Sequence, residues 1–264
     1  MRSKRILVCL LTALLAVPMS IHASGFEPER LSTKDNDVQL RAGFEFDKKV
    51  NRWLSVAWSE ELRLKSNFTS LDRIYSDLSL GFKPTKWLKI NADYTFIAID
   101  HDGKKKTNFE RYWDLRHRVT AGVTFTHKTL TNWEFSLKER VVTTFLTGDK
   151  YDKNEKCSPN VELRSKLMAA YKVRPVPVIP YVFVELCNTL RVPELDIDGN
   201  YLNKVRSGVG VQYRFNKRNC IDFSYRFDYN LDHKLKVNKA GLLKSVTDAK
   251  EFNNIFSVSY KYKF

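Results

Sequence analysis

The last stretch of the chain, residues 252–264, alternates between apolar and polar side chains and ends on an aromatic residue. Successive side chains of a β-strand point to opposite faces, so this period of two predicts a strand with one apolar and one polar face. The apolar face carries Phe256, Val258, Tyr260, Tyr262 and Phe264. Such a strand would leave a sheet edge free to pair with other chains, and closure into a barrel removes that edge. The sequence therefore favours a closed barrel.

The ending also resembles the C-terminal assembly signal of bacterial outer-membrane barrels, in which alternating aromatic residues finish on a terminal phenylalanine. Tyr260, Tyr262 and Phe264 fit this pattern, whereas Ser259 stands where a glycine is usual. The resemblance implies that the barrel-assembly machinery is a partner.

The other end of the chain predicts export. Three basic residues among the first five precede an apolar run, 6–17, and small residues follow around Ala23. This is the layout of a secretory signal peptide, here residues 1–23. The run is short for a membrane-spanning helix, and no later segment has the roughly 18 unbroken apolar residues that such a helix needs. We therefore expect an exported protein located in the outer membrane.

Alternation continues along most of the mature chain, after a polar lead-in at 24–36. The expected strands cover 38–46, 53–65, 74–82, 88–96, 115–125, 133–145, 163–171, 182–186, 205–215, 221–229 and 252–264. Single-chain bacterial barrels have an even number of strands, so we expect about 12, with 10 as the alternative. Residues 24–36 then form either an additional strand or a segment that threads the lumen, and residues 37–264 form the barrel.

Two regularities favour a transmembrane, antiparallel, up-and-down barrel. The connections alternate between short and long, as in barrels with short periplasmic turns and long outer loops, the longest here being about 231–251. Trp53, Trp87 and Trp133 each follow a short turn, which predicts an aromatic girdle at one rim; ordinary packing beside turns is the alternative. A soluble lipocalin-like barrel, with its apolar face inward, would show the same period of two. The number of long strands favours the membrane form.

The polar face of this barrel would point inward and would be densely charged. The predicted lumen charge network comprises Arg41, Glu45, Glu61, Arg63, Arg73, Asp77, Asp93, Asp114, Arg116, Arg118, Glu134, Arg140, Arg164, Arg206, Arg214, Asp222 and Arg226. Burial of an unpaired charge is costly, so most of these groups must be paired or hydrated. Two interpretations stay open: a lumen filled by salt bridges, or a narrow water-filled pore whose cationic excess favours anions.

The net charge of +15 and the 28% of charged residues would suit a soluble protein. They do not exclude a membrane barrel, because only every second strand residue meets lipid. Loss of the three basic residues of the signal peptide lowers the net charge to +12. A basic surplus often indicates nucleic acid as a partner, and export argues against it. The expected partners are outer-membrane lipid, lipopolysaccharide and small anionic solutes.

The sequence predicts no enzyme, no cofactor and no metal site. Four histidines follow the signal peptide: His101, His117, His127 and His233. None shows the pattern of nucleophile, base and orienting group that catalysis requires. A lipid-modifying enzyme is the remote alternative to a barrel of unknown activity.

Three cysteines remain after removal of the signal peptide. Cys157 and Cys187 would meet at the outer rim of one hairpin, whereas Cys220 lies beside a turn at the opposite rim. Bridged Cα atoms must lie within about 7 Å. The alternatives are therefore a Cys157–Cys187 disulfide and three unpaired thiols.

Nearly all of the mature chain resembles a family of exported proteins of unknown function from Gram-negative bacteria that are expected to be outer-membrane barrels. The resemblance lies in the segments KKVNRWLSVAWSEELRLK, KPTKWLKINADYTF, RHRVTAGVTF, FSLKERV and YRFNKRNCIDFSYRFDYN. These are hairpin segments without a catalytic signature. The resemblance implies location and fold, and no activity.

Overall fold

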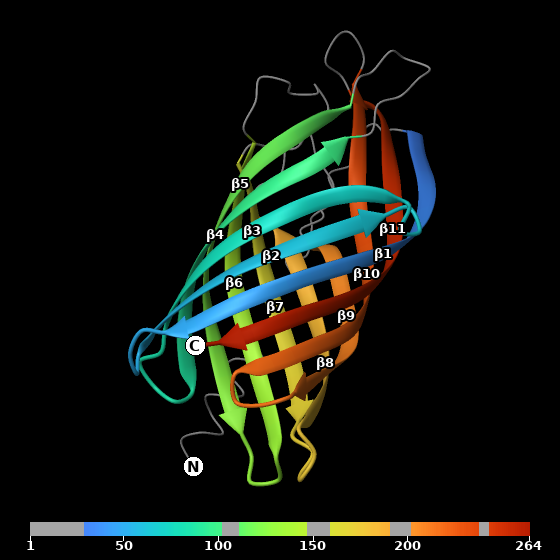
Figure 1. Cartoon of the computed structure of the whole chain (residues 1–264). Coiled ribbons are helices and arrows are strands. Elements are labelled where there is room, and N and C mark those ends of the chain that lie inside the picture. Colours follow the sequence, from blue (N-terminus) through green and yellow to red (C-terminus); the bar gives the residue numbers. More distant parts are fainter. Residues whose placement is uncertain (1–28, 102–110, 147–158, 191–201, 238–242) are drawn as a thin grey trace, which may run out of the picture.

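The computed structural model describes residues 29–101, 111–146, 159–190, 202–237 and 243–264. These residues form a single sheet of eleven strands (Figure 1). The strands are β1 (Glu29–Lys49), β2 (Leu54–Lys65), β3 (Ser70–Phe82), β4 (Leu88–His101), β5 (Tyr112–Lys128), β6 (Trp133–Leu146), β7 (Asn160–Tyr171), β8 (Val178–Thr189), β9 (Leu202–Arg214), β10 (Asn219–Val237) and β11 (Leu243–Lys263). None of the described residues belongs to a helix that is long and apolar enough to span a membrane.

Each strand pairs with its neighbours in the chain, and β1 pairs with β11, which closes the barrel. The predicted all-β closed barrel is thus confirmed. The described strands number eleven, between the expected 12 and 10. Consecutive strands alternate in direction, so an odd number leaves the first and last strands pointing the same way. Accordingly, β1 and β11 pair in parallel from Glu29↔Ser245 to Asp47↔Lys263, and all other pairs are antiparallel.

One end of the barrel carries short turns, at 50–53, 83–87, 129–132, 172–177 and 215–218. Asparagine side chains shape two of them. Asn51 Oδ1 accepts hydrogen bonds from the backbone N–H groups of Trp53 and Leu54, both at 2.8 Å. Asn216 Oδ1 does the same for Arg218 and Asn219, again at 2.8 Å. A short polar side chain that bonds its own backbone favours a turn over a continued strand.

The opposite end carries the longer connections, with one exception. The connection between β2 and β3 covers only residues 66–69, where a long loop was expected. Ser66, Asn67 and Phe68 all adopt positive φ angles, between 54° and 69°, so the chain reverses within a single turn. The N–H of Asn67 donates to the carbonyl of Val38, 3.1 Å away, which ties this turn to β1.

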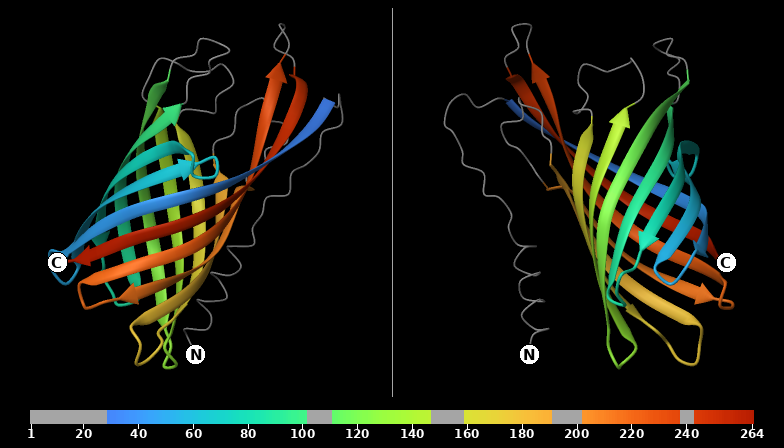
Figure 2. Two further views of the ribbon diagram at one scale, coloured as in Figure 1. Left: turned by 45° about the vertical axis from the view of Figure 1, so that its right-hand side comes forward. Right: turned by 90° about the vertical axis from the view of Figure 1, so that its left-hand side faces the viewer.

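The longest expected loop, 231–251, is also shorter than predicted. β10 extends to Val237 and β11 begins at Leu243, and the two strands pair throughout this region. Together with β1, whose residues 29–36 belonged to the predicted lead-in, they form a three-stranded extension. Figure 2 shows this extension leaning away from the wall formed by β8 and β9. Residues 29–36 of β1 lack an apolar stripe, so hydrophobic alternation could not reveal them. In β10, Leu231, Leu235 and Val237 alternate with charged residues, and this period of two could have extended the predicted strand.

The outer face of the barrel is apolar on every strand. Exposed outward-facing side chains include Phe44, Trp58, Leu78, Ile90, Val119, Val141, Leu167, Val182, Val209, Phe223 and Phe256, one from each strand in order. Soluble monomers rarely expose contiguous apolar patches beyond a few hundred Å². The apolar face therefore points outward, which contradicts the lipocalin-like alternative.

The three tryptophans that follow short turns lie at the short-turn end and are about half exposed. The guanidinium carbon of Arg52 lies 4.3 Å from the ring centre of Trp53, and Trp87 stacks on Phe125. The C-terminus lies at the same end (Figure 1). There Phe264 packs against Tyr262 and against Phe46 of β1, with ring centres 4.8 and 6.3 Å apart. Aromatic side chains thus gather at one rim, as the sequence predicted.

Gly210 on β9 makes room for an inward-pointing tyrosine of β8. The Tyr181 ring covers Gly210 so closely that a Cβ atom there would overlap it, and the Tyr181 hydroxyl donates to Asp222 Oδ1 at 2.7 Å. Pairing of a glycine with a covering aromatic ring is a known way to build curved barrel walls.

We expect Gly210→Ala to lower the free energy of unfolding by about 1–3 kcal/mol, because the added methyl group must displace the Tyr181 ring. The measurement is urea unfolding of the barrel in lipid vesicles, followed by tryptophan fluorescence. In a Tyr181→Ala background the same change should cost much less, since the two residues are in contact. Equal losses in both backgrounds would show that the ring is not the cause.

Candidate functional site

The barrel encloses a cavity of about 890 Å³ that receives side chains from all eleven strands. Thirteen of the predicted network residues line it: Arg41, Glu45, Glu61, Arg63, Arg73, Asp77, Asp93, Arg116, Arg118, Arg140, Arg164, Arg206 and Arg226. The inward direction follows from alternation, because the opposite face of each strand carries the apolar residues. We refer to this cavity as the lumen.

The other four predicted residues lie away from the lumen lining. Asp114 accepts a 2.8 Å hydrogen bond from Arg116. Glu134 lies 3.3 Å from Lys128 Nζ and 3.9 Å from Lys172 Nζ, near the short turns. Arg214 is exposed at the end of β9, and Asp222 is bonded to Tyr181. These four residues occupy strand ends or hydrogen-bond to side chains of the wall.

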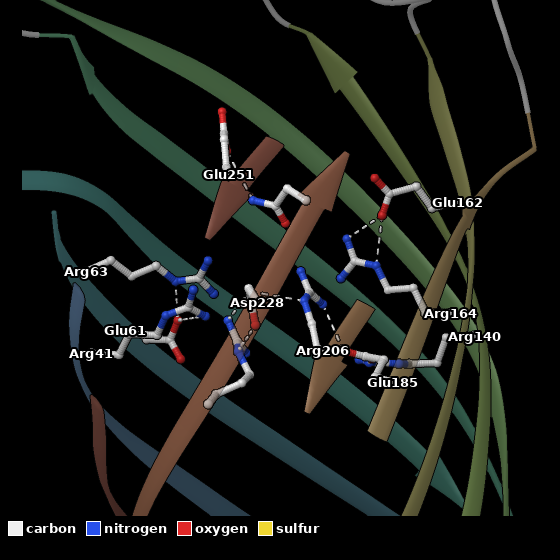
Figure 3. A network of polar contacts seen from close by, with 12 residues as sticks. Arg41, Glu61, Arg63, Arg140, Glu162, Arg164, Glu185, Arg206, Asp228 and Glu251 are labelled. Atoms are coloured by element: carbon white, nitrogen blue, oxygen red, sulfur yellow. Dashed lines mark hydrogen bonds and ion pairs between the residues drawn. The ribbon is translucent and has the colours of Figure 1, made fainter. Parts of the chain in front are cut away.

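A chain of alternating charges crosses the lumen from β6 to β10 (Figure 3). Glu185 is shared by two arginines: it contacts Arg140, and its Oε2 lies 2.8 Å from Arg206 Nη1. Arg206 Nε in turn lies 3.3 Å from Asp228, whose other oxygen is 2.7 Å from Arg226 Nε. The side chains of Glu185 and Asp228 are only 5% exposed. Each buried carboxylate therefore depends on two guanidinium groups for its charge balance.

A second cluster lies on β1, β2 and β3. Arg41 and Arg63 face each other across the strand pair, and Glu61 contacts both of them. Arg63 also donates to the Tyr75 hydroxyl at 3.0 Å, and its guanidinium carbon lies 3.9 Å from the centre of that ring. Arg73, next across the sheet from Arg63, lies 2.7 Å from Asp72. One carboxylate thus serves two arginines here as well.

Charge is unevenly distributed around the lumen. The wall from β5 to β10 contributes nine basic residues: Arg116, Arg118, Lys138, Arg140, Arg164, Lys166, Lys204, Arg206 and Arg226. The same wall contributes three acidic residues to the lining: Glu162, Glu185 and Asp228. The remaining strands contribute five basic residues and seven acidic ones to the lining. Among the described residues, one side of the lumen is therefore strongly cationic and the other weakly anionic.

Sequence alternation missed several residues that the structure places in the lining. A register shift between β2 and β3 at Arg63/Leu64 interrupts the period of two, and both Asp72 and Arg73 line the lumen. Alternation in one strand cannot reveal such an irregularity of pairing. Tyr75 lies two residues before Asp77, and Phe183 lies two residues before Glu185. Alternation therefore places both aromatic side chains on the inward face. They were overlooked because aromatic residues were assigned to the lipid-facing side.

The described residues include only one cysteine of the predicted disulfide, Cys187. Cys157 and the signal peptide, 1–23, lie outside them. Cys187 is buried and faces Arg164 across β7 and β8, and it is a free thiol in the structure, as is Cys220. The pairing of Cys157 with Cys187 stays a prediction.

The described part of the chain contains no group of three or more His, Cys, Asp or Glu side chains that could hold a metal ion. His101 ends β4, stacks on Tyr112 and places Nε2 3.7 Å from Asp114 Oδ2. On the lipid-facing side, His117 Nδ1 lies 2.6 Å from the Tyr94 hydroxyl.

Comparisons with known proteins gave one family match. A family model described as "Protein of unknown function (DUF2490)" matches residues 42–238. Among solved structures, the β-domain of the Bordetella autotransporter BrkA is 12% identical, with 80% of this chain and 82% of that chain covered and a TM-score of 0.42. The NanC porin is 9% identical, with 86% and 99% covered and a TM-score of 0.46. No curated protein matched the chain.

Proposed function

Because the chain belongs to the DUF2490 family, whose description assigns no activity, we propose from its geometry that it is an outer-membrane barrel whose lumen passes small anions. The apolar outer face on all eleven strands supports the membrane location. The short-turn end, with its tryptophans and the C-terminus, would then face the periplasm.

The observation that carries the anion preference is the basic excess of the lumen. Its lining has 14 basic and 10 acidic residues among those described. Lys138, Lys166 and Lys204 have no carboxylate of a described residue within 4.0 Å. Rings of arginine and lysine attract anions and repel cations in a narrow pore. Charges that are already paired contribute little to this field, so the unpaired lysines should dominate it.

Planar-bilayer recording of the refolded protein tests the proposal. We expect discrete conductance steps and, in a potassium chloride gradient, a reversal potential that indicates chloride preference. Lys166→Glu should reduce that preference or reverse it, because it replaces an unpaired lumen cation with an anion. Lys172→Glu is the matched control, because Lys172 lies outside the lumen lining near the short turns. Absence of steps, or a clear cation preference of the unmodified protein, would contradict the proposal.

A further inference from the structure

The lumen contains two pairs of like charges that no described residue neutralises at close range. Asp77 and Asp93 lie on β3 and β4, and no lysine or arginine nitrogen of a described residue lies within 4.0 Å of either carboxylate. Lys138 and Lys166 lie directly opposite each other on β6 and β7. Like charges directly opposite each other in a sheet are destabilising, and diagonal neighbours such as Asp77 and Asp93, which pair with Thr95 and Ser79, are still within reach of each other. Each pair would therefore gain from a ligand of opposite charge.

The acidic pair is preorganised and retains free acceptor capacity. Ser79 Oγ lies 2.6 Å from Asp93 Oδ1 and 3.2 Å from Asp77 Oδ2, so one hydroxyl proton serves two carboxylates. Thr95 donates a second hydrogen bond to Asp77, at 2.5 Å. Two ionised carboxylates offer about eight acceptor sites, and an ammonium group supplies three donors. The hydroxyls thus fix the carboxylates and leave most acceptor sites open.

The basic pair likewise has open donors. Each ammonium group carries three N–H donors. Lys166 Nζ lies 3.9 Å from the ring centre of Phe183, which holds its side chain against the wall. A carboxylate or phosphate between the two lysines would accept hydrogen bonds from both and would relieve their repulsion.

Both pairs lie at a similar depth in the barrel. Asp77 is five residues before the end of β3 at Phe82, and Asp93 is five residues after the start of β4 at Leu88. Lys138 is five residues after the start of β6 at Trp133, and Lys166 is five residues before the end of β7 at Tyr171. All four residues therefore lie in the half of the lumen next to the short turns.

Strand β5 separates the pairs and presents small neutral residues between them. Asp93 pairs with Thr120 and Lys138 pairs with Thr124, so Gly122 is the inward-facing residue midway, and the Arg140 side chain lies over it. Four residues along β5 and two strand spacings across it separate the backbones by roughly 16 Å. The side chains of both pairs reach into this gap. A solute that reaches both pairs must therefore carry its opposite charges several bonds apart, and it would lie beside the Arg140 side chain.

We propose that this acidic and basic arrangement is a binding subsite for small zwitterions, with the ammonium group of the solute on Asp77 and Asp93 and its anionic group on Lys138 and Lys166. The proposal rests on the proposed channel function and deepens it, because the lumen would then prefer zwitterions among the solutes it admits. The anionic group is a carboxylate or a phosphate, since both have the required acceptors.

Three probes of equal chain length test the subsite in planar bilayers: 4-aminobutyrate, butyrate and butylammonium at neutral pH. We expect 4-aminobutyrate to interrupt the chloride current at roughly tenfold lower concentration than either probe with a single charge, because it makes charge-assisted bonds at both ends. The double variant Asp77→Asn/Asp93→Asn should abolish the advantage of 4-aminobutyrate over butyrate. Lys138→Gln/Lys166→Gln should weaken the block by both. Glu134→Gln, outside the lining, should change neither.

The two proposals fail in different ways. A chloride-selective current that butyrate blocks as well as 4-aminobutyrate does would overturn the subsite and leave the channel standing. If the barrel carries no current, calorimetric titration of the refolded protein with the same probes and variants tests the subsite directly. Binding of 4-aminobutyrate that depends on both pairs would support the subsite, and absence of binding would refute it.

Discussion

Glu185→Gln is expected to lower the free energy of unfolding by about 3 kcal/mol. Glu185 is the only carboxylate of a described residue within 4.0 Å of Arg140, and it also contacts Arg206. Removal of one member of a buried ion pair leaves its partner uncompensated, at a typical cost of about 3–5 kcal/mol. Water in the lumen can hydrate part of the exposed guanidinium groups, which places the expected loss at the low end. The measurement is urea unfolding in lipid vesicles at neutral pH.

Glu45→Gln provides the matched control for this charge removal. Glu45 Oε1 lies 2.6 Å from Lys261 Nζ, and both side chains are about one-third exposed. Exposed ion pairs typically contribute about 0–1 kcal/mol. The two variants therefore make the same chemical change in the same lumen at sites that differ in burial. If both cost the same, the charge chain around Glu185 does not stabilise the barrel beyond an ordinary surface pair.

Alternation placed the central part of nearly every strand, because lipid outside and water or paired charge inside impose opposite requirements on successive residues. It did not place the extension formed by β1, β10 and β11. There, residues such as Lys34 and Asp35 pair through their backbones with β11, and no apolar face is required. Backbone hydrogen bonds carry no sequence signal of their own, which is why 29–36 were assigned to a lead-in that forms an additional strand or threads the lumen. Residues 231–237 were assigned to a loop although Leu231, Leu235 and Val237 alternate with charged residues.

Side chains in the lumen show a similar limit of prediction from sequence alternation. Alternation alone placed Arg41, Arg140 and Arg206 inside the barrel, as the structure shows. It could not pair Arg140 with Glu185, because these residues come from β6 and β8, which are not neighbours. Nor could alternation show which charges are paired, because pairing depends on the register between strands. Register fixes Lys138 opposite Lys166 and Arg140 opposite Arg164, and this information comes from the sheet as a whole.

Leu167→Arg is expected to destabilise the barrel in lipid vesicles by about 2–4 kcal/mol, the cost of a cation on the lipid face near the bilayer midplane. The Leu167 side chain is 54% exposed and lies between Leu137 and Val184 in the middle of the apolar outer face. The measurement is urea unfolding in vesicles, repeated in detergent micelles, where the basic side chain can reach water more easily and the loss should be smaller.

Phe215→Arg is the matched control, because it changes the depth in the membrane and keeps the exposed fraction of the replaced side chain nearly the same. Phe215 is 55% exposed, almost the same as Leu167, but it lies just beyond the end of β9 at the short-turn rim. An arginine at the interface should cost only about 0–1 kcal/mol. Exposed apolar residues of a soluble barrel would tolerate arginine equally well at both positions, since water would meet both. A marked difference between the two variants in vesicles is therefore the signature of a bilayer around the barrel, and equal tolerance would refute the membrane location on which the channel proposal depends.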